Sequence, residues 1–242
     1  EEITKFNAQD RNIYGNYQGK RLGEIWGYTS DRLFQKDDFD ENGKLKKGIA
    51  SQALFESGNF KFEPGDVKYK DLDGNGKITY GKNTVEDHGD LSVIGNELPN
   101  FEYSFNLGAS YKGFDVSLFF QGVGKRDYWP TGAVGIAGGG SGYMDAAFDH
   151  QMNYWTPEHT DAFYPRPVNM AWTSNGKSYL RQTRFLEDMS YLRCKNITVG
   201  YTLPAKWVQK AYFQSFRIYF SGENLFEFDN MKLPLDPEST NY

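Results

Sequence analysis

The segment from residue 101 to residue 121 constrains the fold more than any other part of the sequence. Six apolar residues alternate with polar or small residues over positions 101–111, which is the period of a β-strand with one apolar face. Lys112 and Gly113 can form a two-residue turn, and a second alternating run follows at 114–121. We therefore predict an antiparallel hairpin with strands of about 10 residues and a tight turn.

Further strands are predicted on both sides of this hairpin. Three more segments have strand character: residues 22–28, 191–203 and 215–224. The apolar parity changes within the second of them, so we expect a β-bulge near Asn196. Pro204 should end that strand, and the connector at 205–214 should contain a helical turn around Trp207.

Two long segments separate these strands, at residues 29–100 and 123–187, and we expect both to be irregular. Loops of this length are uncommon in compact soluble domains, but they are normal on the outer side of outer-membrane barrels, whose periplasmic turns are short. Short turns and long loops alternate along the chain, so both long loops should lie on one side. With about six strands recognisable, we expect a fragment that lacks the last barrel strand and the upstream part of the protein.

Composition narrows the classes of function. The chain has 27 Lys and Arg against 32 Asp and Glu, for a net charge of −5, and it has no basic run, which argues against nucleic-acid binding. No stretch of about 18 apolar residues could form a membrane-spanning helix. The single cysteine, Cys194, excludes an internal disulfide framework. An aromatic content of 17% with 26 glycines suits a β-barrel membrane protein, and it also suits a carbohydrate-binding β-sandwich.

Several motifs occur in a definite order. They are Gly-Glu-Ile-Trp-Gly-Tyr at 23–28, Leu-Phe-Gln at 33–35, Pro-Gly-Asp-Val-Lys-Tyr-Lys-Asp at 64–71, Asp-Gly-Asn-Gly-Lys-Ile at 73–78, Ile-Gly-Asn at 94–96, the hairpin at 101–121, Trp-Thr-Pro-Glu at 155–158, Tyr-Pro-Arg at 164–166, Tyr-Leu-Arg at 191–193 and Gly-Glu-Asn-Leu-Phe at 222–226. Together, over about residues 20–240, the chain resembles the SusC/RagA-type TonB-dependent outer-membrane transporters.

This resemblance implies an all-β fold: the C-terminal segment of a large antiparallel transmembrane β-barrel with long extracellular loops. Residues 1–242 would belong to one plugged barrel of about 22 strands, whose N-terminal plug and last strand are absent from this chain. The implied function is TonB-coupled import of large nutrients, mostly oligosaccharides and sometimes peptides. The implied partners are a SusD-like surface lipoprotein, TonB and outer-membrane lipid, and the implied location is the outer membrane of a Bacteroidetes-like Gram-negative bacterium.

Two other classes remain open from the residues. One is a soluble carbohydrate-binding β-sandwich, in which the apolar face of 101–121 would cover a protein core instead of lipid. The other is a glycoside hydrolase module, because a glycosidase needs only two carboxylates. No sequence motif singles out a catalytic pair of carboxylates, and the three histidines have no recognisable nucleophile partner. We therefore predict that the protein is not an enzyme.

One acidic loop follows the first eight positions of an EF-hand. Asp71, Asp73 and Asn75 would supply side-chain oxygens and Lys77 a backbone carbonyl, the ligands that Ca²⁺ prefers. Lys82 occupies the position of the missing bidentate glutamate, and a downstream acid would have to replace it: Glu86, Asp87 or Asp90. The other interpretation is a turn that binds no ion. For the similar loop at 38–43, the turn is the favoured interpretation.

The second long segment carries candidate contacts for a nutrient or a partner protein. We select Trp129, Tyr143, Trp155, Tyr164, Arg166 and Trp172. Their rings could stack on sugar faces, and the guanidinium could bind hydroxyl groups. The competing interpretation is that most of these aromatic side chains hold the loop together or lie at the membrane interface.

Overall fold

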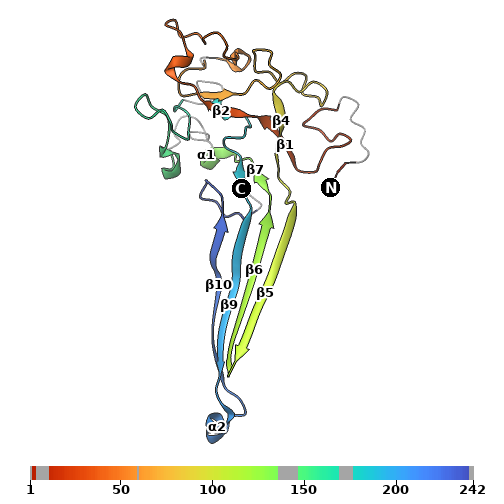
Figure 1. Ribbon diagram of the computed structural model, residues 1–242, viewed down its shortest axis with the longest axis vertical. Helices are drawn as coiled ribbons and strands as arrows, with labels where there is room; N and C mark the ends of the chain where they lie inside the picture. The colour runs from red at the N-terminus through yellow and green to blue at the C-terminus, as the bar shows by residue number, and fades with distance from the viewer. Residues whose placement is uncertain (1, 4–10, 59, 136–146, 169–176, 240–242) are drawn as a thin grey trace.

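The computed structural model describes residues 2–3, 11–58, 60–135, 147–168 and 177–239. It consists of a long four-stranded sheet with an irregular domain at one end (Figure 1). We call the first part the long sheet. We call the second part, built from the described residues of 11–100 and 125–190, the loop domain.

The long sheet contains two pairs of long strands. They are β5 (Phe101–Tyr111), β6 (Phe114–Gly124), β9 (Tyr191–Thr202) and β10 (Arg217–Asp229), in the order β10-β9-β6-β5, and every neighbouring pair is antiparallel. Lys112 and Gly113 have φ angles of 49° and 88°, and positive values at both central residues are those of a tight hairpin turn. The hairpin predicted from the sequence is confirmed.

A β-bulge explains the change of apolar parity in β9. The register of β9 against β6 skips Lys195. Apolar residues on both sides of the bulge, Cys194 and Ile197, therefore lie on the same face as Phe120. The bulge that was predicted near Asn196 is confirmed.

The end of the chain differs in detail from the prediction. The last strand, β10, runs to residue 229 instead of 224, because a second bulge between Glu223 and Phe226 lets it continue along β9. The preceding connector holds α2 (Ala205–Val208) and the short 3₁₀ helix η5 (Gln209–Ala211). The helical turn predicted around Trp207 is confirmed.

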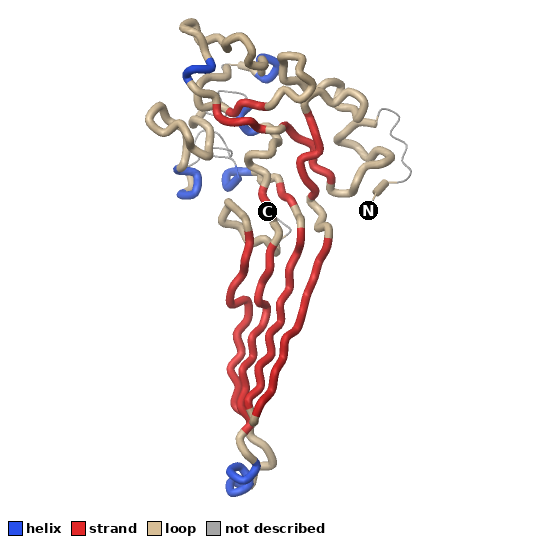
Figure 2. Tube along the Cα trace, viewed as in Figure 1, coloured by secondary structure: helices blue, strands red, loops and turns tan. Residues whose placement is uncertain are grey.

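The two long segments are less irregular than expected. They hold β2 (Ser30–Leu33), β3 (Val67–Tyr69), β4 (Leu91–Asn96), β7 (Asp127–Tyr128), β8 (Glu187–Asp188), α1 (Gly132–Gly135) and four 3₁₀ helices, η1 (Lys36–Asp38), η2 (Ala53–Phe55), η3 (Asp149–Met152) and η4 (Lys177–Tyr179). The strand before them, β1 (Glu24–Tyr28), pairs with β4, β2 pairs with β3, and β7 pairs with β8 (Figure 2). The sequence missed most of these elements because they are too short for a period to be visible. Among the described residues, no helix has both the length and the apolar character needed to cross a membrane.

Among the described residues, the main cluster of buried hydrophobic side chains belongs to the loop domain. Its buried members are Ile13, Tyr17, Trp26, Tyr28, Leu33, Phe34, Phe39, Phe55, Phe60, Phe62, Val67, Tyr69, Ile78, Leu91, Trp129, Tyr164 and Phe185. None of them comes from the long sheet. The aromatic residues of a segment that looks polar in sequence therefore build a packed domain.

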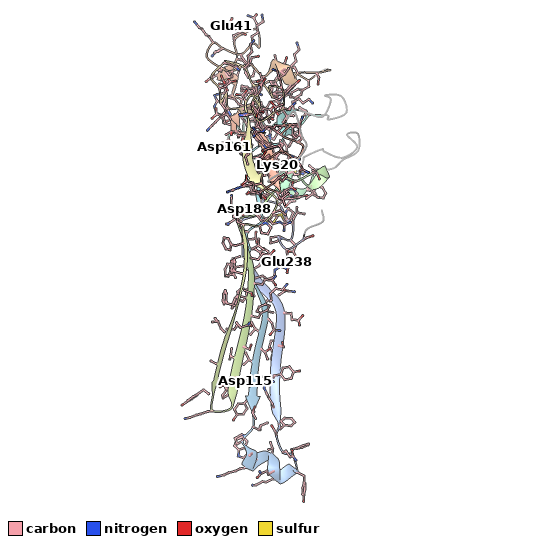
Figure 3. The ribbon with its side chains drawn as sticks, turned by 90° about the vertical axis from the view of Figure 1, so that its right-hand side faces the viewer. Lys20, Glu41, Asp115, Asp161, Asp188 and Glu238 are labelled. Carbon is pink, nitrogen blue, oxygen red and sulfur yellow. The ribbon has the colours of Figure 1, made fainter. Side chains whose placement is uncertain are left out.

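The long sheet has one apolar and one polar face. On the apolar face, Leu107 is 51% exposed, Phe220 72% and Phe228 65%. On the polar face, Arg217 forms an ion pair with Asp115 at 2.5 Å. Asp115 lies toward the end of the long sheet that is remote from the loop domain, far from Glu41 (Figure 3). Within the described part of the chain no second sheet covers the apolar face, which is not the arrangement of a β-sandwich.

The separate core of the loop domain leads to a stability prediction. Phe34 is fully buried, with its ring 5.4 Å from that of Phe39, so Phe34→Ala should lower the free energy of unfolding of this domain by about 3–5 kcal/mol. Leu54→Ala, at a side chain that is 51% exposed, is the control. Limited proteolysis of the protein in detergent should cleave the loop domain faster only in the Phe34 variant, with the long sheet unaffected. Equal cleavage of both variants would contradict the assignment of the core.

Candidate functional site

A buried ion pair between Asp66 and Arg166 holds the loop domain together. Nε and Nη2 of Arg166 lie 3.0 and 2.9 Å from Oδ2 of Asp66. The Ser178 hydroxyl donates to Oδ1 of Asp66 at 3.0 Å, and the backbone N–H of Glu63 donates to Oδ2 at 2.8 Å. Because the Asp66 side chain is fully buried, these contacts replace the water that would otherwise solvate its charge.

This ion pair joins two segments that lie far apart in the sequence, one from each long loop. Burial raises the pKa of the Asp66 carboxyl, and the positive charge of Arg166 opposes that shift. Arg166 also forms an ion pair with Glu63 at 3.1 Å and donates to the carbonyl of Lys61 at 3.1 Å. The guanidinium is therefore fixed at several points, as expected for a structural role.

Gly65 allows the chains to approach closely beside this pair. Its φ angle is 93°, a conformation that favours glycine. A Cβ atom there would lie 2.5 Å from the ring of Trp155. The N–H of Gly65 donates to the carbonyl of Phe34 at 2.8 Å, and the N–H of Arg166 donates to the carbonyl of Gly65 at 2.9 Å. Three of the sequence motifs, at 64–71, 155–158 and 164–166, thus meet at one point.

The structure places the predicted contact residues mostly inside the loop domain. Trp129 is 9% exposed and Tyr164 is 3% exposed, and the Tyr164 ring stacks on that of Phe185 at a centroid distance of 5.9 Å. Trp155 and Arg166 are half-buried around Gly65 and Asp66. Tyr143 and Trp172 lie outside the described residues. For the described members the geometry favours a packing role, and contact with a nutrient or partner stays a prediction.

The acidic loop at 71–77 brings three carboxylates together. One oxygen each of Asp71, Asp73 and Asp90 lies within 4.8 Å of the others. Asp71 accepts hydrogen bonds from the N–H groups of Gly74 and Gly76, each at 2.8 Å, so the loop is wrapped around this carboxylate. Asp90 is one of the three downstream acids named from the sequence, and only the fold selects it.

The remaining predicted ligands lie in the same loop. The side-chain oxygen of Asn75 accepts from the N–H of Lys77 at 2.8 Å, and its amide group donates to Asp73 at 2.8 Å. Asp90 accepts from the N–H groups of Leu72 and Thr79, each at 2.7 Å. The donor set consists of oxygen atoms, which fits a hard cation such as Ca²⁺. A bound cation at this cluster remains a proposal.

The loop at 38–43 has a different arrangement. Asp38 is buried and bound by Arg32 through two hydrogen bonds of 2.5 and 2.7 Å, and this contact lowers the pKa of the Asp38 carboxyl. Asp40 accepts from the N–H groups of Asn42 and Lys44. The two carboxylates have separate partners, which agrees with the turn interpretation.

A further ionic cluster was not predicted from the sequence. Arg193 of β9 forms ion pairs with Glu227 of β10, with Asp236 at 2.5 Å and with Glu238 at 2.6 Å, and Lys195 pairs with Glu238 at 2.8 Å. The cluster ties the segment after β10 to the sheet. An arginine within a β-strand was the only signal in the sequence, and it does not identify partners about 40 residues away.

Comparison with known proteins relates this chain to TonB-dependent receptors. The chain is 30% identical over 222 residues to TonB-dependent receptor P3 of Formosa agariphila, a match that covers 92% of this chain and 19% of the relative. It is 25% identical over 187 residues to TonB-dependent receptor P26 of the same organism, covering 74% of this chain and 16% of the relative. The chain therefore spans less than a fifth of the length of these curated relatives. No family model matches it.

Solved structures show the same fold. The RagAB peptide importer in its 'closed-closed' state matches with a TM-score of 0.58 and 18% identity, covering 98% of this chain and 23% of the solved chain. The 'open-open' state of the same importer matches with a TM-score of 0.53 and 16% identity, covering 92% of this chain and 20% of the solved chain. Both likenesses concern the fold alone.

The buried ion pair yields one prediction. Arg166→Gln should lower the free energy of unfolding of the loop domain by about 3–5 kcal/mol, because Asp66 would lose its counter-ion. Arg11→Gln is the matched control, since its 2.6 Å pair with Glu86 is exposed and such pairs contribute about 0–1 kcal/mol. The measurement is protease resistance of the full-length protein as a function of urea concentration. Adding Asp66→Asn to the Arg166 variant should restore part of the loss, and equal losses for Arg166→Gln and Arg11→Gln would refute the assignment.

The acidic cluster yields a second prediction. Ca²⁺ added to the EDTA-treated full-length protein should bind, and Asp90→Asn should weaken that binding at least tenfold because a charged ligand is removed. Asp40→Asn, in the neighbouring turn, should leave binding unchanged. Isothermal titration calorimetry in detergent measures both. Identical heats for wild type and the Asp90 variant would assign the loop to a turn without an ion.

Proposed function

We propose that this chain, a segment of a SusC/RagA-type TonB-dependent receptor, forms part of the wall and the extracellular face of an outer-membrane barrel that imports large nutrients. One observation carries the proposal: the long sheet has a continuous apolar face that no described part of the protein covers. An apolar face of this extent is stable in lipid or against another protein layer, and is costly in water.

The dimensions of the sheet support a membrane-spanning role. Its strands have 11 to 13 residues, which at about 3.3 Å per residue is enough to cross a bilayer at a tilt. Both outer strands, β5 and β10, pair on one side only within the described residues. Open edges with polar backbone groups are not tolerated in lipid, so further strands of a closed barrel should pair there.

The placement of the connections supports an orientation in which the loop domain faces the outside of the cell and the short turns face the periplasm. The Lys112-Gly113 turn and α2 lie at one end of the long sheet, and the loop domain lies at the other (Figure 1). In outer-membrane barrels the short connections face the periplasm and the long ones face outward. The exposed aromatic residues near α2, Trp207 at 63% and Tyr212 at 98%, are suited to the membrane interface on the periplasmic side.

The resemblance to the SusC/RagA family supports a proposal for the nutrient and the partners. We propose oligosaccharides as the nutrient, a SusD-like lipoprotein as the cap and TonB as the source of energy coupling. Peptides are the second candidate, because the solved structures with this fold belong to the RagAB peptide importer. The relatives are receptors and importers by name, which supports a protein that is not an enzyme.

The lipid-facing assignment is tested with charged substitutions on the two faces of β5. Phe105 lies on the apolar face opposite Phe120, and the adjacent Ser104 lies on the polar face opposite Gln121. Phe105→Arg should reduce outer-membrane assembly of the full-length protein, since arginine near the midplane of a barrel costs about 2–4 kcal/mol. Ser104→Arg is the matched control and should assemble.

Two readouts separate assembly from transport. The amount of heat-modifiable barrel in the outer-membrane fraction reports assembly, and growth of the complemented deletion strain on oligosaccharides or on peptides, with and without TonB, reports uptake. If both arginine variants assemble equally, the assignment of faces is wrong. If the wild type restores no TonB-dependent growth on any nutrient, the import proposal fails.

A further inference from the structure

A cavity of about 310 Å³ lies in the loop domain. Its floor is aromatic and apolar, and its rim carries polar and charged groups; it is lined by Trp26, Tyr28, Phe55 and Leu91, which are buried, and by Tyr14, Tyr80, Asn83, Lys177, Leu180 and Arg181. None of these residues belongs to the Asp66–Arg166 pair or to the acidic cluster. The volume lies within the range of small-molecule sites.

The aromatic side chains present rings to this cavity. Tyr80 is 41% exposed, and its ring lies 6.4 Å from that of Phe55 at an angle of 46°. Tyr28 lies beneath, with its ring 5.4 Å from that of Phe55. The buried Phe55 ring and the more exposed Tyr80 ring are inclined to each other, and together they offer an apolar, aromatic wall to a ring-shaped ligand.

The charged groups at the rim are cationic. Lys177 and Arg181 form no ion pair with any residue that the structure describes, although the chain carries a net charge of −5. Burial raises the pKa of the Tyr14 hydroxyl, and the charge of Arg181 opposes this shift. Two cationic residues without a described ion-pair partner thus line the cavity, where they can bind an anionic group through charge-assisted hydrogen bonds.

The main chain in the cavity floor has no capacity left for a peptide. The N–H of Tyr28 donates to the carbonyl of Arg181 at 2.8 Å, and the carbonyl of Tyr28 accepts from the N–H of Thr183 at 3.0 Å. Peptides that add to a sheet need a free strand edge, and this position has none. The recognition groups that remain are ring faces, hydroxyl groups and two cations.

We propose that this cavity binds an acidic sugar residue of the imported nutrient. The apolar face of the sugar ring lies against Tyr80 and Phe55, and its carboxylate or sulfate binds Lys177 and Arg181. The inference rests on the proposed import function for the source of the ligand. It adds the position of a binding site in the loop domain and the charge of the sugar that the site selects.

The test is calorimetric titration of the full-length receptor in detergent with four probes: an oligogalacturonate tetramer, a sulfated galactan tetramer, neutral galactotetraose and an acidic tetrapeptide. At least one of the two anionic sugars should bind at least tenfold more tightly than the neutral sugar, and the stronger of the two identifies the anionic group. Tyr80→Ala should weaken binding of that sugar, because the exposed ring face is lost.

Variants that remove positive charge test whether this cavity is the site at which the anionic sugar binds. The double variant Lys177→Gln with Arg181→Gln should raise the Kd for the anionic sugar about tenfold or more. The control double variant Lys36→Gln with Lys44→Gln, at two exposed lysines elsewhere in the loop domain, should change it less than twofold. Arg181→Lys, which retains the charge, should preserve most of the affinity and shows that the site remains folded.

Several results would overturn the proposal: no binding of either anionic sugar, equal affinity for the neutral sugar, tighter binding of the peptide, or an unchanged Kd in the Lys177 and Arg181 double variant. TonB-dependent uptake is measured separately in cells. Uptake that persists while these binding results fail would refute the site alone. Specific binding without TonB-dependent uptake would refute the import function and leave the site in place.

Discussion

The loop domain depends on the buried ion pair between Asp66 and Arg166. Each residue comes from a different long segment, and the pair is satisfied by Ser178 and by the backbone of Glu63. Removing either partner would leave a charge in the protein interior, which is among the more costly single defects in a fold. The close approach at Gly65 and the aromatic core are arranged around this pair, so the two long loops behave as one structure.

The loop domain and the long sheet are stabilised in different ways. The loop domain buries its own aromatic residues and needs no further cover for its core. The long sheet has regular pairing but leaves its apolar face exposed, so its stability depends on a lipid environment or another protein layer. The loop domain can therefore keep its shape independently of what covers the apolar face of the long sheet.

The ionic sites among the described residues differ in their balance of charge. The Asp66 pair and the Arg193 cluster each contain charges of both signs, and both connect elements that are distant in sequence. The acidic cluster at Asp71, Asp73 and Asp90 has carboxylates without a cationic partner among its members, which suits a hard cation. The cavity at Lys177 and Arg181 has the opposite imbalance, which suits an anion.

The sequence by itself determined the long strands, the tight turn at Lys112-Gly113 and the bulge near Asn196. Alternation of apolar and polar residues is a local pattern, so it can be recognised from adjacent positions alone. It also indicated Asp71, Asp73 and Asn75 as one acidic loop. Only the tertiary structure decided that Asp90 joins that loop, that Trp155 packs on Gly65, and that Trp129, Tyr164 and Phe185 of the second long segment are buried. These contacts join residues far apart in the chain, and no local pattern encodes which distant partner a side chain will meet.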